Sequence, residues 1–334
     1  MTTESPTMRA VIQHRYGPPE RVLRLDQTAR PSPGKDEVRI LVRATSVNTP
    51  DWATVAGVPY AVRLQSGLRR PAHPVRGSDV AGVVETVGPG VTDLQSGDEV
   101  LGSLWGGNTG TFAQYTVAPA AQLVRKPAGL TFEAAAASVM TGLTALIAMR
   151  DVGQVHTGSR VLINGASGGV GTMAVQIART LGAEVTGVCG PRNVELVRSL
   201  GADHVIDYTK QDFTQQEQRY QVILDNVLNH SPRAVSRLLA RDGVFIPNSL
   251  GNNGGLLAAL PRMARASLLG RLGPTNVRFV TLVVSHANLN ALVHLLETDE
   301  VKVIIDRTYP LDQAADAVAH VLNHHAAGKV AIVV

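Results

Sequence analysis

Cysteine is nearly absent from this chain: among 334 residues only Cys189 is a cysteine. A single thiol cannot form an intrachain disulfide, and it cannot build a zinc site from several cysteines. Cys189 stands at the end of a short apolar stretch that reads as a buried strand. We therefore expect this residue to have a structural role and not a catalytic one.

A large net charge and long apolar runs are absent as well. Lys and Arg number 31 against 27 for Asp and Glu, a net charge of +4, and no run of basic residues occurs. This balance predicts no nucleic-acid partner and suits a small anionic ligand. The longest apolar stretch, Ala134–Met149, is too short to span a bilayer, so it predicts a buried helix. Met1–Ala10 has no export or transit pattern, and we expect a cytoplasmic protein.

The most informative feature that is present lies at residues 160–171, Arg-Val-Leu-Ile-Asn-Gly-Ala-Ser-Gly-Gly-Val-Gly. Val161–Ile163 is a predicted buried strand, a glycine turn follows, and a helical pattern begins directly after it. Glycines let a chain turn tightly beside a pyrophosphate, and a helix N-terminus offers unpaired N–H groups to its charge. We predict a dinucleotide-binding turn with these contact residues: Gly165, Ser167, Gly168, Gly169, Val170 and Gly171.

Short strands separated by Gly/Pro turns fill the region from Ala10 to about Val124. This pattern predicts a β-barrel-like domain. Its expected strands are Glu37–Ala44, Val80–Val87, Glu99–Leu101 and Phe112–Val117.

After Pro127 the pattern changes to alternating strands and helices, beginning with a helix that Thr131 can cap. Six strands joined by helices predict a doubly wound parallel sheet of the Rossmann type, an α/β fold. The expected strands are Val161–Ile163, Glu184–Val188, His204–Ile206, Val222–Leu224, Gly243–Ile246 and Arg278–Val284. The expected helices lie near Val170–Leu181, Val194–Leu200, Pro232–Leu239 and Asn288–Leu296.

The last part of the chain has no place in a completed six-stranded sheet. It reads as strands Thr308–Pro310 and Ala331–Val334 around a helix Leu311–Leu322. We therefore expect this tail to return to the first domain. The predicted domains are 1–127 (catalytic), 128–299 (dinucleotide-binding) and 300–334 (the returning segment).

Seven motifs in a fixed order give the chain a family resemblance. They are Asn48-Thr-Pro-Asp51, Gly77-Ser-Asp79-Val-Ala-Gly82, Gly97-Asp-Glu-Val100, Thr141-Gly142, Asn164–Gly171, Leu200–Tyr208 and Gly328-Lys-Val330. The chain resembles the medium-chain dehydrogenase/reductase superfamily, in its zinc-free quinone oxidoreductase (zeta-crystallin-like) branch. The resemblance implies a GroES-like catalytic domain, a Rossmann domain, an active cleft between them, and a homodimer.

In zinc-dependent members of this family, two cysteines and a histidine hold the catalytic metal. Motif matching puts Asn48, Ser78 and Ala137 at those three positions. None is a thiolate or an imidazole, so we predict that the chain holds no zinc.

The cofactor prediction rests on the end of the second Rossmann strand, Val188-Cys189-Gly190-Pro191-Arg192-Asn193. An acidic residue there would bind the ribose 2′-OH of NAD, whereas a guanidinium can hold the 2′-phosphate of NADP. We therefore predict NADPH, with Arg192 as the clamp and Gly190 and Asn193 nearby. A solvated Arg192 at the start of the next helix is the alternative. Tyr208 matches a family position near the adenosine phosphate, although a packed tyrosine explains it equally well.

The resemblance also implies the residues at the nicotinamide end. It puts Asn48 and Thr141 beside the ring and Asn226, Val227, Ser249 and Leu250 at strand ends near its ribose, and it adds Lys329 to the cofactor contacts. Asn48 could instead be a turn-forming residue ahead of Pro50.

Three further residues lie near this end of the site in the sequence motifs or the following loop. Asp51 reads most simply as a helix cap and Asp79 as structural. Tyr60, in the loop Gly57–Pro74, could supply a proton or only line the rim of the pocket.

Without a metal, hydrogen-bond donors must polarise the substrate oxygen. A quinone or an α,β-unsaturated carbonyl suits this, because the developing negative charge is delocalised. The expected reaction is hydride transfer from NADPH to such an acceptor. Two alternatives stay open. One is an enoyl-thioester reductase, which would need cationic residues for a carrier phosphate. The other is a non-catalytic, regulatory dinucleotide-binding protein.

Two further segments of the chain are expected to lie at the surface. The segment 251–276 could be a lid over the substrate, an ordinary packed helix or, through residues 256–272, a membrane contact. The edge strand Arg278–Val284 would be a pairing hazard if left open, so we expect it to join two copies in a homodimer.

Overall fold

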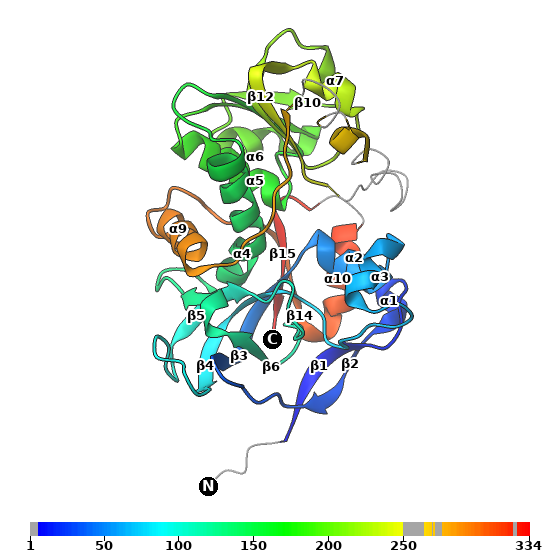
Figure 1. Cartoon of the computed structure of the whole chain (residues 1–334), viewed down its shortest axis with the longest axis vertical. Coiled ribbons are helices and arrows are strands. Elements are labelled where there is room, and N and C mark those ends of the chain that lie inside the picture. Colours follow the sequence, from blue (N-terminus) through cyan, green and yellow to red (C-terminus); the bar gives the residue numbers. More distant parts are fainter. Residues whose placement is uncertain (1–5, 250–263, 269, 271–275, 323–325) are drawn as a thin grey trace. The chain divides into compact units, whose positions relative to one another are not determined.

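The computed structural model describes residues 6–249, 264–268, 270, 276–322 and 326–334 (Figure 1). They form two compact units. Unit 1 comprises Met1–Met140, Val283–Glu297 and Ile305–Val334, and unit 2 comprises Thr141–Leu282 and Thr298–Ile304. Helix α9 (His286–Glu297) belongs to unit 1 because it packs against strand β7 (Leu123–Arg125), whereas the domains predicted from the sequence put it with the dinucleotide-binding residues.

Unit 2 contains a six-stranded sheet in which every pair of neighbouring strands is parallel, as the sequence predicts. The strand order is β10-β9-β8-β11-β12-β13, so the order reverses between β8 and β11. In doubly wound sheets, ligands bind outside the carboxyl ends of the strands at such a reversal. The strands are β8 (Arg160–Asn164), β9 (Glu184–Cys189), β10 (His204–Asp207), β11 (Tyr220–Asp225), β12 (Leu239–Pro247) and β13 (Asn276–Val277).

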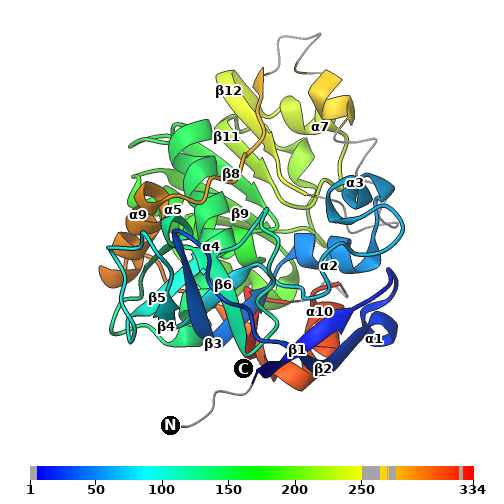
Figure 2. The same ribbon diagram turned by 60° about the horizontal axis from the view of Figure 1, so that its bottom comes forward.

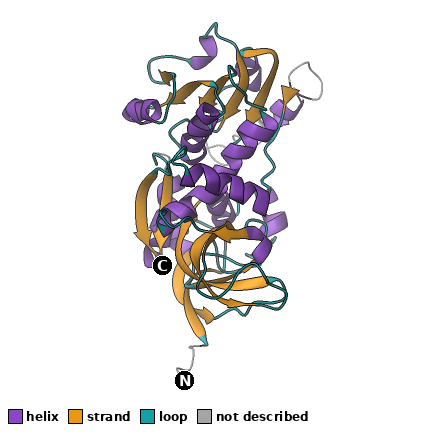
Figure 3. Ribbon diagram, turned by 90° about the vertical axis from the view of Figure 1, so that its left-hand side faces the viewer, coloured by secondary structure: helices purple, strands orange, loops and turns teal. Residues whose placement is uncertain are grey.

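Helices alternate with these strands, and Figure 3 shows the two kinds of element by colour. They are α5 (Gly169–Thr180), α6 (Val194–Ser199) and α7 (Pro232–Ser236), with short turns η4 (Pro191–Asn193) and η5 (Phe213–Gln215). The core holds large apolar side chains from several strands, among them Leu162, Ile223 and Phe245. Their burial on both faces of the sheet explains why these strands read as continuous apolar runs.

The predicted cap at Thr131 is confirmed. Helix α4 (Phe132–Leu146) begins at the next residue, and the Ala134 N–H donates to Thr131 Oγ1 at 3.2 Å. The helix continues into a π-helical turn, η3 (Ile147–Val152). Among the described residues, Phe132–Val152 is the one helix with the length and apolarity of a membrane span, and 83% of its apolar window is buried inside the protein. Such burial is typical of a core helix.

Unit 1 is built around the long strand β3 (Glu37–Val47), which pairs antiparallel with β4 (Asp79–Val87), β6 (Tyr115–Pro119) and β15 (Lys329–Val333). Strand β5 (Glu99–Ser103) extends the sheet from β4 to β7, and β14 (Ile305–Pro310) pairs parallel with β15. Because β15 lies against β3, the C-terminal tail returns to the first domain, as predicted.

A separate hairpin of β1 (Thr7–Gln13) and β2 (Leu23–Ala29) completes this unit. Figure 2 shows it beside α1 (Pro19–Val22) and α10 (Ala314–Leu322). Helix α10 contacts α1, β2 and α2 (Thr49–Ala56), so the returning tail packs on elements from the beginning of the chain.

The predicted edge strand Arg278–Val284 is wrong. The sixth strand has only two residues, with Asn276 opposite Val244 and Val277 opposite Phe245. The Arg278 N–H still donates to Phe245 O, at 3.0 Å, but residues 278–285 have no regular secondary structure. A strand requires a hydrogen-bonded neighbour, which the alternating pattern of side chains cannot supply by itself.

Candidate active site

The glycine turn between β8 and α5 requires glycine at two positions. Gly165 has φ +75°, and a Cβ on it would lie 2.9 Å from Val227 Cγ2. A Cβ on Gly171 would lie 2.1 Å from the carbonyl oxygen of Gly165, a contact that only backbone movement could relieve. At Gly168 the nearest atom to such a Cβ is 3.5 Å away, an ordinary contact. The turn is therefore tightly packed on its inner side and open at Gly168.

The first turn of α5 presents backbone N–H groups to this opening. Gly169, Val170 and Gly171 begin the helix, so their N–H groups have no partner within it. The predicted contact residues Ser167 and Asn193 lie together, because Asn193 Nδ2 donates to Ser167 Oγ at 3.1 Å. These groups form a cradle of the kind that holds a pyrophosphate.

The residues predicted to contact the adenosine end of the cofactor lie beyond the end of β9. A Cβ on Gly190 would lie 3.1 Å from Tyr208 Oη, so glycine here leaves room for that phenol. Tyr208 is 57% exposed, and Arg192 is exposed in the adjacent turn η4. Burial raises the pKa of the Cys189 thiol to about 11, so this cysteine is a neutral, inert group at the strand end.

A hydrogen-bond network joins the ends of β8 and β11, where the strand order reverses. Asp225 Oδ1 accepts from Asn164 Nδ2 at 2.7 Å and from the N–H groups of Leu228 and Val227 at 2.8 and 3.1 Å. Burial raises the pKa of Asp225. The sequence analysis missed this carboxyl, although a polar residue that directly follows a buried parallel strand was the available signal.

The predicted residue Asn226 extends the network. Its Nδ2 donates to Asn164 O at 3.2 Å, and its Oδ1 accepts from Asn248 Nδ2 at 2.8 Å. Ser249 follows at the end of β12 and is half-buried. Leu250, the other predicted contact, lies outside the described residues. Asn164 and Asn248 are further polar groups here that the sequence analysis did not assign.

In unit 1 the structure gathers a buried polar group around Asn48. Asn48 Nδ2 donates to Asp79 Oδ2 at 2.8 Å, and Lys329 Nζ donates to Asn48 Oδ1 at 2.5 Å and to Val47 O at 2.8 Å. Asn48 and Lys329 are each 4% exposed. Both ends of the Asn48 amide thus have a charged partner, and the orientation of the amide is determined. Lys329, predicted as a cofactor contact, lies within this buried group.

Asp51 and Ser78 complete what we call the Asn48 cluster: Ser46, Asn48, Asp51, Ser78, Asp79 and Lys329. The Asn48 N–H donates to Asp51 Oδ2 at 2.8 Å, which confirms Asp51 as a cap of α2. Ser78 Oγ lies 3.3 Å from Asp51 Oδ1 and 3.5 Å from Asn48 Nδ2. Ser46 Oγ donates to Asp79 Oδ2 at 2.7 Å.

Burial dominates the electrostatics of the Asn48 cluster. It raises the pKa of Asp51 to about 7, with the negative charge of Asp79 adding to the effect and the Asn48 N–H opposing it. Burial also raises the pKa of Asp79 and lowers that of Lys329. Two carboxyl groups share one ammonium here, so the cluster holds a proton near neutral pH.

The three residues that motif matching puts at the zinc positions of metal-dependent relatives are Asn48, Ser78 and Ala137, and their side chains do not fit that ion. Asn48 and Ser78 are neighbours, and Ala137 is buried in α4 with no ligating atom on its side chain. The Asn48 amide oxygen already accepts from the Lys329 ammonium, whose charge would repel a metal cation.

The two other predicted catalytic residues, Thr141 and Tyr60, differ in exposure. Thr141 is buried in α4, at 6% exposure. Tyr60 is 68% exposed, and its ring lies 4.6 Å from the Arg63 guanidinium. Tyr60 is therefore a surface residue of the loop after α2, which contains the short helices η1 (Tyr60–Val62) and α3 (Arg63–Ser66).

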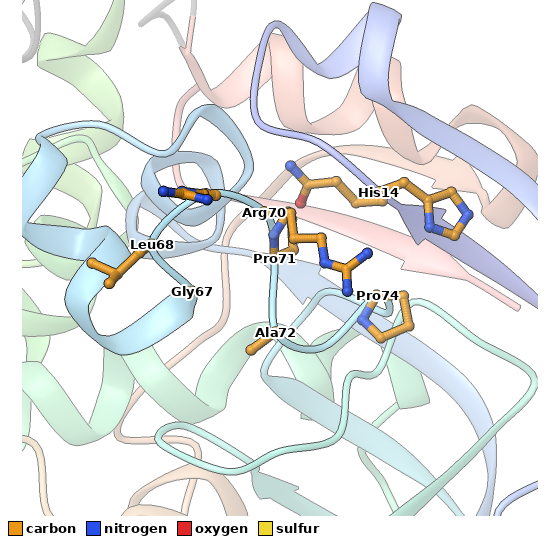
Figure 4. Close-up of a pocket in the computed structure, with 9 residues that line it drawn as sticks. His14, Gly67, Leu68, Arg70, Pro71, Ala72 and Pro74 are labelled. Carbon is orange, nitrogen blue, oxygen red and sulfur yellow. The ribbon is translucent and has the colours of Figure 1, made fainter.

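The same loop forms one side of a pocket of about 690 Å³ (Figure 4). Figure 4 shows Arg70 extending from the loop and His14 from the residue that follows β1. Arg69 is a further cationic residue of the lining, and no Asp or Glu belongs to it. The lining consists of Gln13, His14, Gly67, Leu68, Arg69, Arg70, Pro71, Ala72 and Pro74.

The predicted lid or membrane segment lies mostly outside the described residues. Of residues 251–276, the structure describes 264–268, 270 and 276. Ala266 is buried in the core of unit 2 and Leu268 is 55% exposed. The three interpretations of this segment stay predictions.

Comparison with known proteins gives the family. Residues 34–128 match the alcohol dehydrogenase GroES-like domain, and residues 200–332 match the zinc-binding dehydrogenase model. The chain is 33% identical to a chloroplastic quinone oxidoreductase, QR1, of Triphysaria versicolor, over 97% of this chain and 98% of that one.

Comparison with solved structures supports the same family. The quinone oxidoreductase of Coxiella burnetii is 27% identical with a TM-score of 0.86, covering 98% of this chain and 99% of that one. A mycobacterial protein solved in complex with NADPH is 26% identical with a TM-score of 0.81, covering 98% and 100% of the two chains. The chain thus combines a parallel α/β sheet with a GroES-like domain, and it belongs to the medium-chain dehydrogenase/reductase superfamily of oxidoreductases, in the quinone oxidoreductase branch.

Proposed function

We propose that this protein is an NADPH-dependent, zinc-independent reductase of quinones or α,β-unsaturated carbonyls. The observation that carries the proposal is the glycine turn at the start of α5, where Gly165 and Gly171 have no room for a side chain. That packing keeps the backbone N–H groups of the turn accessible to a dinucleotide pyrophosphate.

The preference for NADPH rests on the residues after β9. An exposed guanidinium at Arg192, with the Tyr208 phenol beside Gly190, suits a 2′-phosphate, and residues 190–194 contain no acidic side chain. The pyrophosphate would lie at Gly168–Gly171, and Ser167 and Asn193 would support the turn from the side. When bound, NADPH supplies the hydride.

The Asn48 cluster supports the choice of acceptor. It offers hydrogen-bonding groups and a buried ammonium but no site for a Lewis-acidic metal. Such a site polarises a carbonyl weakly, which is sufficient when the negative charge spreads over an enolate or hydroquinone. Oxidation of a plain alcohol would require a stronger electrophile or a base.

Titration followed by turnover tests the proposal. We expect NADPH to bind more tightly than NADH and to be oxidised when a quinone or an enone is added. Protein from which metal ions have been removed with a chelator should still reduce the acceptor. Absence of binding by either nucleotide, or a requirement for stoichiometric zinc, contradicts the proposal. Binding without turnover of any acceptor would favour the regulatory alternative.

The pocket of Figure 4 favours a second candidate, an enoyl-thioester reductase. His14, Arg69 and Arg70 line it without any carboxylate, so it suits the phosphate of a pantetheine carrier arm. The double variant Arg69→Ala/Arg70→Ala should then raise KM for a coenzyme A thioester by ~10-fold or more and leave KM for a simple enone unchanged. Arg233→Ala, an exposed arginine of α7, is the control. Equal KM values for the thioester in both variants would exclude this candidate.

We also propose a homodimer. The segment after β13 exposes Phe279 (40%) and Val283 (49%), apolar side chains next to backbone groups that a second copy could pair. Sedimentation at micromolar concentration should give twice the mass of one chain. A single-chain mass there would contradict the dimer.

A further inference from the structure

The loop after α2 exposes three large apolar side chains within nine residues. Tyr60 of η1 is 68% exposed, Leu64 of α3 is 76% exposed, and Leu68, just after α3, is 68% exposed. Among the described residues, every other large apolar side chain is less exposed, and Tyr208 follows at 57%. Exposed apolar side chains that gather in one segment mark an interaction surface. We call these three residues the Tyr60 stripe.

The Tyr60 stripe has helical spacing. Its members recur every four residues, and side chains four residues apart lie on one side of a helix. Tyr60 belongs to η1 and Leu64 to α3, two helical turns that follow each other without a break. Gly67 then ends α3 with φ +112°, and a Cβ on it would lie 2.1 Å from the carbonyl oxygen of Arg70. Glycine at this turn keeps Leu68 close to the end of the helix that carries Leu64.

Hydrogen bonds hold this loop in place. The Tyr16 hydroxyl donates to Gly67 O at 2.5 Å and lies 2.9 Å from Ser66 Oγ. The Ala72 N–H donates to Ser66 O at 2.8 Å and closes the turn that contains Leu68. Since the loop satisfies several of its own backbone groups, the exposure of the Tyr60 stripe is a property of the folded chain.

Positive charge accompanies the Tyr60 stripe. Residues 52–78 contain four arginines and no Asp or Glu, so this segment alone accounts for the net charge of +4 of the chain. Arg69 and Arg70 directly follow the stripe and are both exposed. The other two, Arg63 and Arg76, are less exposed and donate hydrogen bonds to groups of the protein itself. The lining of the adjacent pocket, shown in Figure 4, has no carboxylate either.

We propose that the loop of residues 57–74 binds the surface of an anionic phospholipid bilayer. The Tyr60 stripe enters the interfacial region, where apolar side chains leave water, and Arg69 and Arg70 bond to lipid phosphates. Arginine suits this position because its apolar stem contacts lipid while its charged end stays at the headgroups. A small soluble anion makes no use of the apolar stripe, and an apolar protein surface makes no use of the two arginines. A bilayer of acidic lipids uses both.

This surface is distinct in sequence from the predicted membrane contact at residues 256–272. It shares Arg69 and Arg70 with the pocket of the thioester candidate, but Tyr60 and Leu64 do not line that pocket. Binding to lipid needs neither NADPH nor an acceptor, so it can fail while the proposed reduction stands. Where that reduction occurs, docking brings the enzyme to acceptors that dissolve in lipid, a consequence that rests on the proposed function.

Co-sedimentation with lipid vesicles tests the proposal. The protein should bind vesicles of phosphatidylcholine with about 30% phosphatidylserine at least ~10-fold more tightly than vesicles of phosphatidylcholine alone. Raising the salt from about 0.1 M to about 0.5 M should weaken this binding, because salt screens the arginine charges. Equal binding to both kinds of vesicle, or none to the anionic kind, overturns the proposal.

The double variant Leu64→Gln/Leu68→Gln tests the apolar part of the surface. Both side chains are exposed, so the fold should be unaffected, and binding to the anionic vesicles should fall by ~10-fold or more. Leu268→Gln, at an exposed leucine of unit 2, is the matched control and should bind as wild type does. Unchanged binding by the double variant contradicts the proposal. Loss of binding in Leu268→Gln alone would move the contact to residues 256–272 and contradict it as well.

The arginine pair separates lipid from a carrier phosphate. Arg69→Ala/Arg70→Ala should lower vesicle binding by ~10-fold or more, whereas Arg233→Ala/Arg237→Ala, at two exposed arginines of unit 2, should leave it unchanged. The leucine double variant should lower vesicle binding and leave KM for a coenzyme A thioester unchanged. If that variant keeps vesicle binding but halves the mass found by sedimentation, the Tyr60 stripe joins two copies of the chain, and the proposal is wrong.

Fluorescence quenching reports which leucine meets the lipid. The tryptophan emission that Leu68→Trp adds to that of wild type should be quenched by lipids with brominated chains. The emission added by Leu268→Trp should not be quenched. Quenching of Leu268→Trp without quenching of Leu68→Trp refutes the proposed surface.

Discussion

The glycine turn of unit 2 and the Asn48 cluster of unit 1 are both polar sites in the same chain, and they are built in opposite ways. The turn uses consecutive residues, Gly165–Gly171, between a strand and the helix that follows it. The cluster takes its groups from β3, α2, β4 and β15, so that Lys329 meets a residue 281 positions earlier.

This difference separates two sources of specificity. In the turn, the binding groups are backbone N–H groups, and the sequence must have glycine where a side chain would not fit. In the cluster, the polar groups are side chains. Each charged side chain needs a partner from a distant segment, because an unpaired buried charge lowers the free energy of unfolding. Substitutions should therefore act on cofactor binding in the first region and on stability and proton chemistry in the second.

The largest effect is expected in the turn. Gly171→Ala puts a Cβ 2.1 Å from the Gly165 carbonyl oxygen, so the turn must shift. We expect NADPH affinity to fall by ~100-fold or more, measured by fluorescence titration, together with a loss of several kcal/mol in the free energy of unfolding. The matched variant Gly168→Ala meets only an ordinary contact at 3.5 Å and should keep wild-type stability. Equal destabilisation of the two would show that packing does not determine this turn.

The second-largest effect is expected in the Asn48 cluster. Lys329→Met leaves Asp79 buried without its cation and removes the partner of Asn48 Oδ1. The free energy of unfolding, measured with urea, should fall by about 3–5 kcal/mol at pH 8. Adding Asp79→Asn to this variant should recover part of the loss, since no unpaired carboxylate then remains. A Lys329→Met protein as stable as wild type would contradict the buried charge balance.

A smaller effect is expected at the cofactor's adenosine end. Arg192→Glu replaces an attraction to the 2′-phosphate with a repulsion, so NADPH affinity should fall by ~10–100-fold while NADH affinity stays the same. Arg198→Glu, an exposed position on α6, serves as the control. If both nucleotides lose affinity equally in Arg192→Glu, the residue supports the fold and does not select the phosphate.

The smallest effect is the pH dependence of stability. The pKa of Asp51 is about 7 in the folded protein against 3.8 as the ordinary value, so the folded chain keeps a proton that the unfolded chain releases. Stability from this group is full below pH 3.8, declines as pH rises toward 7, and then levels off. The slope is at most about 1.4 kcal/mol per pH unit, and Asp51→Asn should flatten it in urea titrations between pH 5 and 8. An identical slope in the variant would place the proton elsewhere.

Local patterns predicted much of this protein correctly. The first five parallel strands, the Thr131 cap, the glycine turn and the returning tail all follow from side-chain periodicity or from residues adjacent in the chain. The edge strand at Arg278–Val284 was predicted on the same kind of evidence and is wrong, because a strand also depends on a neighbour that its own sequence does not encode.

The amino-acid sequence by itself determined the parallel sheet and the dinucleotide turn, because both depend on glycine positions and apolar spacing within a few residues of one another. Only the tertiary structure decided that Lys329 lies beside Asn48, that Asp51 faces Ser78, and that Asp225 joins two strand ends. The pKa of a carboxyl depends on its burial and on the charges around it, and chain folding alone brings those groups together.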